Sequence, residues 1–358
     1  MQCSKLARRS ALALLILLMA SMSACADWFI GGDPQDDPET NFEIFWQTFD
    51  RHYSHFELKN IDWHGVYAHY RPLVGPQTSD DELFTIFSEM ISTLNDGHVY
   101  LATSTGRFYS DGYSRGAARN FNREHVRTTY LTEADRVVGE GNIIYGWAAP
   151  EIGYIRIASL SGGAGYGQDV RGWITDMDIP LRRFASAQGI IIDLRNNSGG
   201  RAFNSQYLAG RFATDRRPFI VTSSRNGPGY GDFSAENHWF VEPTGASQFT
   251  GPVVVLTNRF SFSAAEWMTL ALRQYPHVTH MGTNSGGGLS MFLPRELPNG
   301  WTFTVSVQDT RCIDGYSYEI VGVEPDVHVE IADQDAKRER DTIMDTAIRD
   351  IRARAARP

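Results

Sequence analysis

The chain has 358 residues, 42% of them hydrophobic and 21% charged, which is enough to bury a large core in one or two domains. Its net charge of −9 argues against a nucleic-acid partner, since nucleic acids are bound through clustered positive charge. Of the three cysteines, Cys3 and Cys25 lie in the N-terminal segment and leave only Cys312 in the folded body, so no internal disulfide is possible there.

The first 25 residues are typical of a bacterial export signal. Three basic residues precede an apolar stretch from 11 to 20, which is too short to span a bilayer. Small residues then precede Cys25, and Met22-Ser23-Ala24-Cys25 resembles a lipobox. We therefore predict a signal peptide over 1–25, lipidation of Cys25, and an exported protein anchored in the cell envelope, on the periplasmic side or in the outer membrane. The alternative is an ordinary secretory signal that is cleaved nearby, after Ala24 or Ala26.

Residues 26–39, rich in Asp, Gly and Pro, predict a disordered tether, and residues 40–105 predict an N-terminal helical subdomain. Thr40-Asn41-Phe42-Glu43 has the pattern of a capping box and opens an aromatic stripe at helical spacing. A second helix is expected to begin at Ser79 and to end before Asn95-Asp96-Gly97. His98 comes directly after this turn and begins a short strand, so its side chain can point into a cleft.

The segment 106–150 shows little periodicity and is expected to form a linker, a small β cap or a lid. From 151 to 335 strands and helices alternate, which predicts an α/β core. The predicted strands are 152–157, 190–194 and 253–256, and the predicted helices are 165–186, 203–213 and 264–275. Residues 223–238 are expected to be a surface loop, Pro298-Asn299-Gly300 the turn of a hairpin, and residues 336–358 a C-terminal helix.

Two predicted strand ends carry residues suited to catalysis. The buried strand 253–256 leads through a short turn to Ser263 and then to a helix, whose first N–H groups and positive dipole end suit a developing oxyanion. The strand 190–194 breaks into Gly199-Gly200, where the backbone can approach a ligand closely. Together these corners predict a serine hydrolase. The alternative for Ser263 is a plain N-cap, a role that serines often fill.

A set of motifs in this order resembles the tail-specific (C-terminal-processing) peptidases and the related tricorn protease core. The motifs are Leu94-Asn95-Asp96-Gly97-His98, Gly153-Tyr154-Ile155-Arg156-Ile157, the run 193–200, Ser263-Ala264-Ala265-Glu266 and Gly322-Val323-Glu324-Pro325-Asp326. The resemblance implies a crotonase-like (Clp-protease-like) α/β catalytic core with an N-terminal helical subdomain. It also implies that Ser263 is the nucleophile of an acyl-enzyme peptidase without a cofactor, and that the N–H groups of Ala264 and Gly200, with Gly199 as the alternative to Gly200, form the oxyanion hole.

The resemblance favours the tricorn-like branch of this family. The processing branch uses a Ser-Lys dyad, but Gly288 stands at the position of that lysine. The tricorn-like branch uses a histidine and a glutamate, which match His98 as general base and Glu319 as the group that orients it. Gly97 stands where tricorn carries a serine, and the stretch between His98 and Ile152 is too short for a complete PDZ domain. A His base predicts that kcat/KM falls on acidification with an apparent pKa between roughly 6 and 7.5.

Other functions remain open on the sequence alone. The chain could be a non-catalytic peptide- or lipid-binding relative of this fold, or an acyl hydrolase that acts on esters or thioesters. The histidines at 52, 55, 64 and 69 lack the spacing of a zinc site such as H-E-x-x-H, so no metal is predicted. The expected partners are a peptide or protein substrate and, through the lipid anchor, a membrane; the sequence assigns no oligomeric state.

Overall fold

The computed structural model describes residues 34–110, 117, 120–163, 172–331, 335 and 340–356. The predicted signal peptide, Cys25 and most of the predicted tether lie outside these residues. Among the described helices, none combines the length and the apolar character needed to cross a bilayer.

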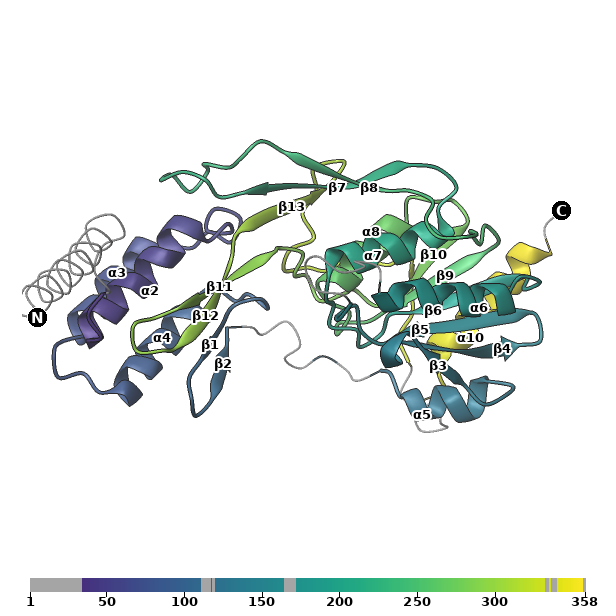
Figure 1. Cartoon of the computed structure of the whole chain (residues 1–358), viewed down its shortest axis with the longest axis horizontal. Coiled ribbons are helices and arrows are strands. Elements are labelled where there is room, and N and C mark those ends of the chain that lie inside the picture. Colours follow the sequence, from purple (N-terminus) through teal and green to yellow (C-terminus); the bar gives the residue numbers. More distant parts are fainter. Residues whose placement is uncertain are drawn as a thin grey trace, which may run out of the picture.

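The N-terminal part of the molecule packs three helices against a four-stranded sheet (Figure 1). The helices are α2 (Pro38–His52), α3 (Trp63–Tyr70) and α4 (Asp80–Ser92), with a 3₁₀ turn η1 (Arg71–Leu73) between the last two. The sheet has the order β11-β12-β1-β2 and consists of β1 (Tyr100–Ala102), β2 (Arg107–Tyr109), β11 (Phe292–Glu296) and β12 (Thr302–Ser306). Two of its strands therefore come from a segment that the sequence analysis assigns to the core.

The helix boundaries follow from local capping chemistry. The α4 helix begins with the capping box expected at Ser79, whose backbone N–H donates to Glu82. In contrast, α2 begins earlier than expected, because Asp37 caps it by accepting the Thr40 N–H at 2.9 Å. The aromatic stripe of α2 is buried core: Phe45 and Phe49 lie 4.9 and 5.6 Å from the ring of Phe303 in β12.

A seven-stranded sheet, of order β14-β10-β9-β6-β5-β4-β3, forms the second part. Its strands are β3 (Arg136–Val138), β4 (Ile143–Ala149), β5 (Ile152–Ile157), β6 (Gly189–Asp193), β9 (Val253–Thr257), β10 (Val278–Gly282) and β14 (Val327–His328). The pairs from β14 to β5 are parallel, whereas β4 and β3 pair antiparallel. Both central strands β6 and β9 are buried on both faces, which explains their continuous apolar sequence.

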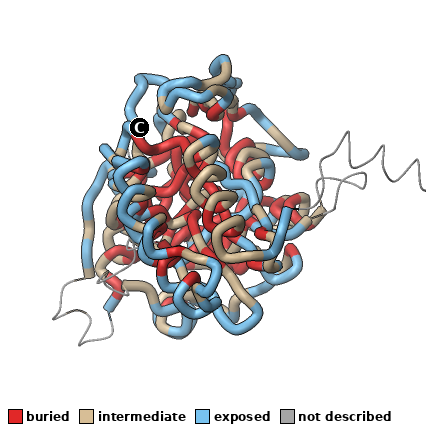
Figure 2. Tube along the Cα trace, turned by 90° about the vertical axis from the view of Figure 1, so that its left-hand side faces the viewer, coloured by how far each residue is buried: buried red, intermediate tan, exposed pale blue. Residues whose placement is uncertain are grey.

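Helices cover both faces of this sheet, so the fold is a mixed α/β fold. One face packs against α7 (Ala202–Ala209) and α8 (Ala264–Leu272), and the other against α10 (Thr342–Ala355). Shorter helical segments are α5 (Arg123–His125), η2 (Val126–Tyr130), η3 (Gly139–Gly141), η4 (Gly172–Met177), α6 (Asp178–Arg183) and η5 (Gly210–Phe212). In the tube view the buried residues fill the interior beneath an exposed shell (Figure 2).

A three-stranded sheet, β13-β7-β8, lies along one side of both parts (Figure 1). It consists of β7 (Arg217–Ser224), β8 (Asn237–Val241) and β13 (Gln308–Cys312), and the sequence pattern does not predict it. Its hairpin reaches the helical part, where Arg225 Nη1 donates to the carbonyl oxygen of Tyr53 at 2.9 Å. This sheet therefore joins the two parts whose residues meet at the site described next.

Candidate active site

Ser263 occupies the sharp corner between β9 and α8. Its backbone angles are φ 58° and ψ −123°, a conformation that costs a non-glycine residue of order 1–3 kcal/mol. The Ser263 N–H donates to Glu266 Oε2 at 2.9 Å, and the preceding Phe262 N–H donates to Asn197 at 2.9 Å. The Glu266 N–H donates to the Ser263 carbonyl at 2.8 Å, and the two residues together form a capping box at the start of α8.

Glu266 connects this corner to the loop 285–288. Its two oxygens also accept the hydroxyl of Ser285 at 2.5 Å, the N–H of Gly287 at 2.7 Å and the N–H of Gly288 at 3.0 Å. Burial raises the pKa of Glu266 to about 7 against the lowering effect of these hydrogen bonds. The ionised carboxylate can accept all four donors, so it is the form that holds the corner in place.

His98 faces Ser263 from the N-terminal part of the chain. Its Nε2 lies 3.1 Å from Ser263 Oγ, and its ring packs between Phe262 and Phe292, with ring centres 4.7 and 5.2 Å away. The His98 carbonyl accepts the hydroxyl of Thr304 at 2.6 Å. Burial lowers the pKa of His98 to about 4, although the charge of Asp96 opposes this shift. The imidazole is therefore neutral at pH 7 and able to accept a proton.

Asp96 fixes the turn that carries His98. Its Oδ1 accepts the His98 backbone N–H at 2.9 Å, and its Oδ2 accepts the hydroxyl of Tyr53 at 2.9 Å. The same Oδ2 lies 3.5 Å from Lys59 Nζ and 3.5 Å from His55 Nδ1. Against the effect of burial, Lys59 and His55 hold the pKa of Asp96 well below its usual value, so this carboxylate is ionised.

Glu319 lies in the same buried cluster and approaches the same nitrogen of His55 as Asp96 does. Its Oε1 is 3.9 Å from His55 Nδ1, and its Oε2 accepts the Leu289 N–H at 2.8 Å. Among the described residues, Glu319 makes no hydrogen bond with His98, whose Nδ1 is buried without a partner. The structure thus brings Ser263 and His98 into contact and places Glu319 behind them, in contact with His55.

Three residues of this cluster are of types that can bind a metal ion. Ligand atoms of His55, Asp96 and Glu319 all lie within 4.8 Å of one another. The ammonium group of Lys59 already lies beside Asp96, and although burial opposes it, the carboxylates of Glu319 and Asp96 raise the pKa of His55. Positive charge is therefore supplied by side chains, and the cluster is better described as a buried ion network than as a cation site.

Gly200 and Ala264 line the same pocket as Ser263 and are the candidate oxyanion donors. Neither Gly200 nor Ala264 donates its N–H to any described residue, whereas Gly199 donates its N–H to Asn197 Oδ1 at 2.8 Å. This difference favours Gly200 over Gly199 as an oxyanion donor. The corner requires glycine, because Gly200 has φ 147° and a Cβ there would overlap the backbone of Leu160.

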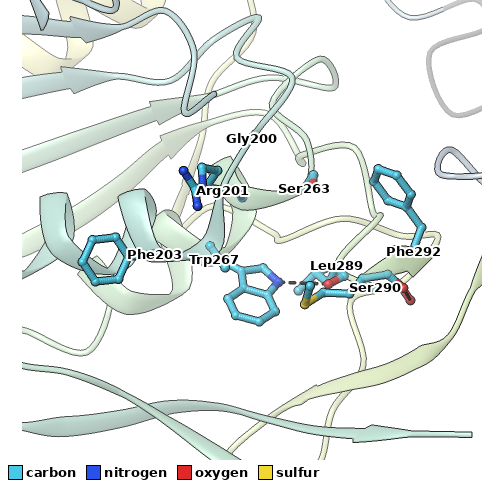
Figure 3. Close-up of a pocket in the computed structure, with 11 residues that line it drawn as sticks. Gly200, Arg201, Phe203, Ser263, Trp267, Leu289, Ser290 and Phe292 are labelled. Carbon is cyan, nitrogen blue, oxygen red and sulfur yellow. Dashed lines mark hydrogen bonds between the residues drawn. The ribbon is translucent and has the colours of Figure 1, made fainter. Parts of the chain in front are cut away.

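A pocket of about 340 Å³ opens at Ser263 (Figure 3). It is lined by Gly200, Arg201, Ala202, Phe203, Ser263, Ala264, Trp267, Leu289, Ser290, Met291 and Phe292. The indole N–H of Trp267 donates to the Leu289 carbonyl at 2.9 Å, shown as the dashed line in Figure 3. The pocket therefore contains the proposed nucleophile and both free N–H groups.

The structure also explains why a lysine is absent from position 288. A Cβ atom on Gly288 would overlap the ring of Phe262, which packs against His98. The space that a lysine side chain would enter is thus filled by the ring that supports the imidazole.

Several residues of the site were not found from the sequence. The sequence pattern indicates Asp96 only as part of a turn, although a carboxylate two residues before a candidate base is a usable signal for a local side chain-to-backbone bond. His55 was considered only as one of four clustered histidines. Outside this cluster, Asp193 and Arg195 form a buried ion pair with an N–O distance of 2.7 Å, extended to Asp341.

Comparisons with known proteins identify the family of this chain. The family model of peptidase family S41 matches residues 151–329, half of the chain, and a model of the tricorn protease C1 domain matches residues 34–92. A solved structure from Parabacteroides merdae is 31% identical, with a TM-score of 0.79, over 88% of this chain and 97% of that chain. The chain therefore belongs to peptidase family S41.

Two curated relatives each match about half of the chain. The carboxy-terminal processing protease CtpA of Bacillus subtilis is 28% identical over 182 residues, which cover 51% of this chain and 36% of CtpA. The tricorn protease of Thermoplasma volcanium is 28% identical over 184 residues, which cover 50% of this chain and 15% of that protease. The chain thus spans well under half the length of these relatives.

Proposed function

We propose that this protein is an exported serine peptidase that hydrolyses peptide bonds through an acyl-enzyme. The observation that carries the proposal is the 3.1 Å approach of His98 Nε2 to Ser263 Oγ, in a pocket also lined by Gly200 and Ala264, whose N–H groups donate to no other residue in the described part of the chain. A protein that only binds a ligand has no need of this combination, so the arrangement favours catalysis over the binding alternative.

The chemistry follows from the positions of these groups. Neutral His98 takes the proton of Ser263 as Oγ bonds to the carbonyl carbon, and the resulting oxyanion is stabilised by the N–H groups of Gly200 and Ala264. The imidazolium then gives its proton to the leaving amine as the C–N bond breaks. In the second half, His98 takes a proton from water as its oxygen bonds to the acyl carbon; the bond from that carbon to Ser263 Oγ then breaks, Oγ takes the proton back from the imidazolium, and the carboxylic acid product leaves.

Glu319 enters the proposal through the resemblance to the tricorn-like branch, as the group that orients His98. Its carboxylate lies 3.9 Å from His55, which lies 3.5 Å from Asp96, and Asp96 in turn accepts the His98 N–H. This sequence of contacts supports an indirect role for Glu319, in which it acts on the base through the ion network.

The finer class and the location belong to the same proposal. The crotonase-like designation of the core is supported by the parallel order of β14 to β5 with helices on both faces. Export and lipid attachment at Cys25 are supported by the basic, apolar and lipobox segments of the sequence. The substrates would then be peptides or proteins outside the inner membrane.

Hydrolysis of fluorescently labelled casein tests the proposal. Wild-type protein is expected to release fluorescence, and Ser263→Ala and His98→Ala should each lose at least ~10³-fold of that rate, since members of a catalytic unit fail together. Far-UV circular dichroism checks that both variants are folded. A folded His98→Ala protein with a tenth or more of the wild-type rate would show that the base lies elsewhere.

A further inference from the structure

The pocket beside Ser263 presents mostly apolar side chains to solvent. Phe203, Met291 and Phe292 are 42%, 48% and 42% exposed, which is unusual for large hydrophobic residues that lie together. Trp267 lies deeper, and its N–H is already bonded to the Leu289 carbonyl, so it offers the pocket an apolar ring (Figure 3). Such a lining suits an apolar group on the ligand.

The strand that supplies one wall of this pocket has a free edge. In the described part of the chain, β11 is the outer strand of its sheet and pairs with β12 on one side only. The Met291 carbonyl accepts the Val307 N–H at 3.0 Å, and the Leu297 N–H donates to the Trp301 carbonyl at 2.8 Å. Odd-numbered residues of this segment therefore point their backbone groups toward β12.

Because backbone groups alternate along an antiparallel strand, the even-numbered residues point theirs away from β12. The N–H and C=O of Phe292 thus face the open edge, beside the ring that packs on His98. The next even-numbered residue, Pro294, offers a carbonyl but has no N–H. This limits pairing along the edge to a short segment and protects the strand from open-ended association.

We propose that the substrate is an extended peptide that pairs with the open edge of β11 through the main chain of Phe292 and inserts a large apolar side chain into the pocket. The inserted side chain, such as Leu, Met or Phe, belongs to the residue whose carbonyl Ser263 attacks. Strand addition of this kind supplies binding through main-chain hydrogen bonds and selectivity through a side-chain pocket. The inference rests on the proposed function, because it takes Ser263 as the attacking group.

The competing assignment is that the pocket accepts an acidic side chain. Arg201 is the charged side chain among the lining residues, so an acidic side chain could pair with it. A basic side chain would enter without a partner and lose its hydration. The apolar residues form most of the wall, which is why we assign the pocket to an apolar side chain and leave the acidic one as an outcome of the test.

Peptide aldehydes test the side-chain assignment without any need for turnover. One tripeptide sequence would end in leucinal, phenylalaninal, alaninal, aspartal or lysinal, and each would compete with fluorophosphonate labelling of the wild-type protein. The aldehyde carbon bonds to Ser263 Oγ, so its side chain occupies the pocket. We expect leucinal and phenylalaninal to protect at about 10- to 50-fold lower concentration than alaninal, from the extra apolar area that they bury.

The outcomes separate the two proposals. If fluorophosphonate labels Ser263 but aspartal protects best, or all aldehydes protect equally, the apolar assignment is overturned and the peptidase assignment stands. If fluorophosphonate does not label Ser263 at all, the proposed function itself fails.

Backbone methylation tests the strand pairing. Leucinal peptides would each carry a single N-methyl group, placed at successive positions. Protection should fall at least ~5-fold where the methylated nitrogen would otherwise donate to the Phe292 carbonyl, and should change little at the neighbouring position. A flat profile would contradict pairing at this edge.

A matched pair of variants tests whether the apolar residues that line the pocket contact the inserted side chain. Met291→Lys places a charge in the pocket and should weaken leucinal protection at least ~10-fold, whereas Leu73→Lys, at a 58% exposed position on the helical part, should leave it unchanged. Phe203→Ala serves as the second pocket variant and should weaken phenylalaninal more than alaninal. Equal effects of Met291→Lys and Leu73→Lys would overturn the assignment.

Discussion

The carboxylate of Asp96 is bonded to the backbone of His98: its Oδ1 accepts the His98 N–H at 2.9 Å, while its Oδ2 accepts the hydroxyl of Tyr53. The histidine that faces Ser263 is thus held through its main chain by a residue of the same turn. Because Asp96 is ionised, its negative charge also favours the imidazolium that forms during proton transfer. This relationship gives Asp96 a role beside that proposed for Glu319.

Comparison of Asp96→Asn with Glu319→Gln separates these roles. We expect Asp96→Asn to lower kcat by ~10²-fold or more with a smaller change in KM, because the amide keeps an acceptor for the His98 N–H but removes the charge. Glu319→Gln should cost less, since its contact with the base is indirect. Steady-state kinetics of both variants decide the order. A larger kcat loss in Glu319→Gln would show that Glu319 is the principal carboxylate.

The pH profile should contain a step from Glu266. Its pKa is raised to about 7, and only its ionised form can accept all four donors, one from Ser263 and three from the loop 285–288. As the pH falls through about 7, protonation removes part of this acceptor and kcat/KM should fall. In Glu266→Gln, activity should be low and nearly independent of pH in this range. An unchanged step in that variant would assign the titration to another group.

His98, the proposed base, should titrate at a lower pH than Glu266. Burial lowers the pKa of His98 to about 4, so its neutral, proton-accepting form persists from alkaline pH down to that region and is lost below it. The sequence alone predicts a single step between roughly 6 and 7.5 from an ordinary histidine. The structure instead predicts that His98 contributes a second, lower step, visible in kcat/KM for a substrate whose own groups do not titrate there.

Position 288 should not accept even a small side chain. Gly288→Ala is expected to destabilise the protein by about 1–3 kcal/mol, because the added methyl group overlaps the Phe262 ring. The same ring supports His98, so activity should fall as well. Gly75→Ala is a matched control, since no atom lies within 4 Å of a Cβ at that position. Urea unfolding of both variants measures the difference; equal stabilities would contradict the packing described here.

Lipidation of Cys25 is expected to anchor the protein in a membrane. Mass spectrometry of the mature protein from its native host should show Cys25 as the first residue, carrying a diacylglycerol group, with an N-acyl chain in addition where the host attaches one. Two or three chains give stable anchoring where one chain gives marginal binding. Cys25→Ser should release the protein from the membrane fraction. An unmodified N-terminus at any residue would refute lipidation.

Local signals in the sequence located much of the site. The apolar run 253–256, the following turn and the helix after Ser263 appear as β9 and α8, and the turn before His98 ends α4 as expected. These features depend on neighbouring residues, namely strand burial, helix capping and turn chemistry. That is why a single sequence indicates the two corners and the residues that they present.

Local sequence signals do not indicate which strands pair when they lie far apart in the chain. The strand β1 pairs with β12, two hundred residues later in the chain, at Leu101 and Phe303. The β13-β7-β8 sheet likewise depends on distant partners, and its hairpin turn was interpreted as a loop. The ion network has the same origin, because His55 meets Glu319 only after α2, the turn at Asp96 and the segment before Gly322 come together. Side-chain neighbours of this kind are set by tertiary packing.

Fluorophosphonate labelling followed by peptide mapping tests the central claim most directly. We expect a label on Ser263 that is lost in Ser263→Ala while the Tm stays nearly unchanged. Ser261→Ala should retain the label, because the Ser261 hydroxyl donates to the Leu194 carbonyl at 2.8 Å and is fully buried. His98→Ala should be labelled much more slowly than the wild-type protein, because Ser263 then lacks its general base. A label on any other serine, or no label on the folded wild-type protein, would contradict the account.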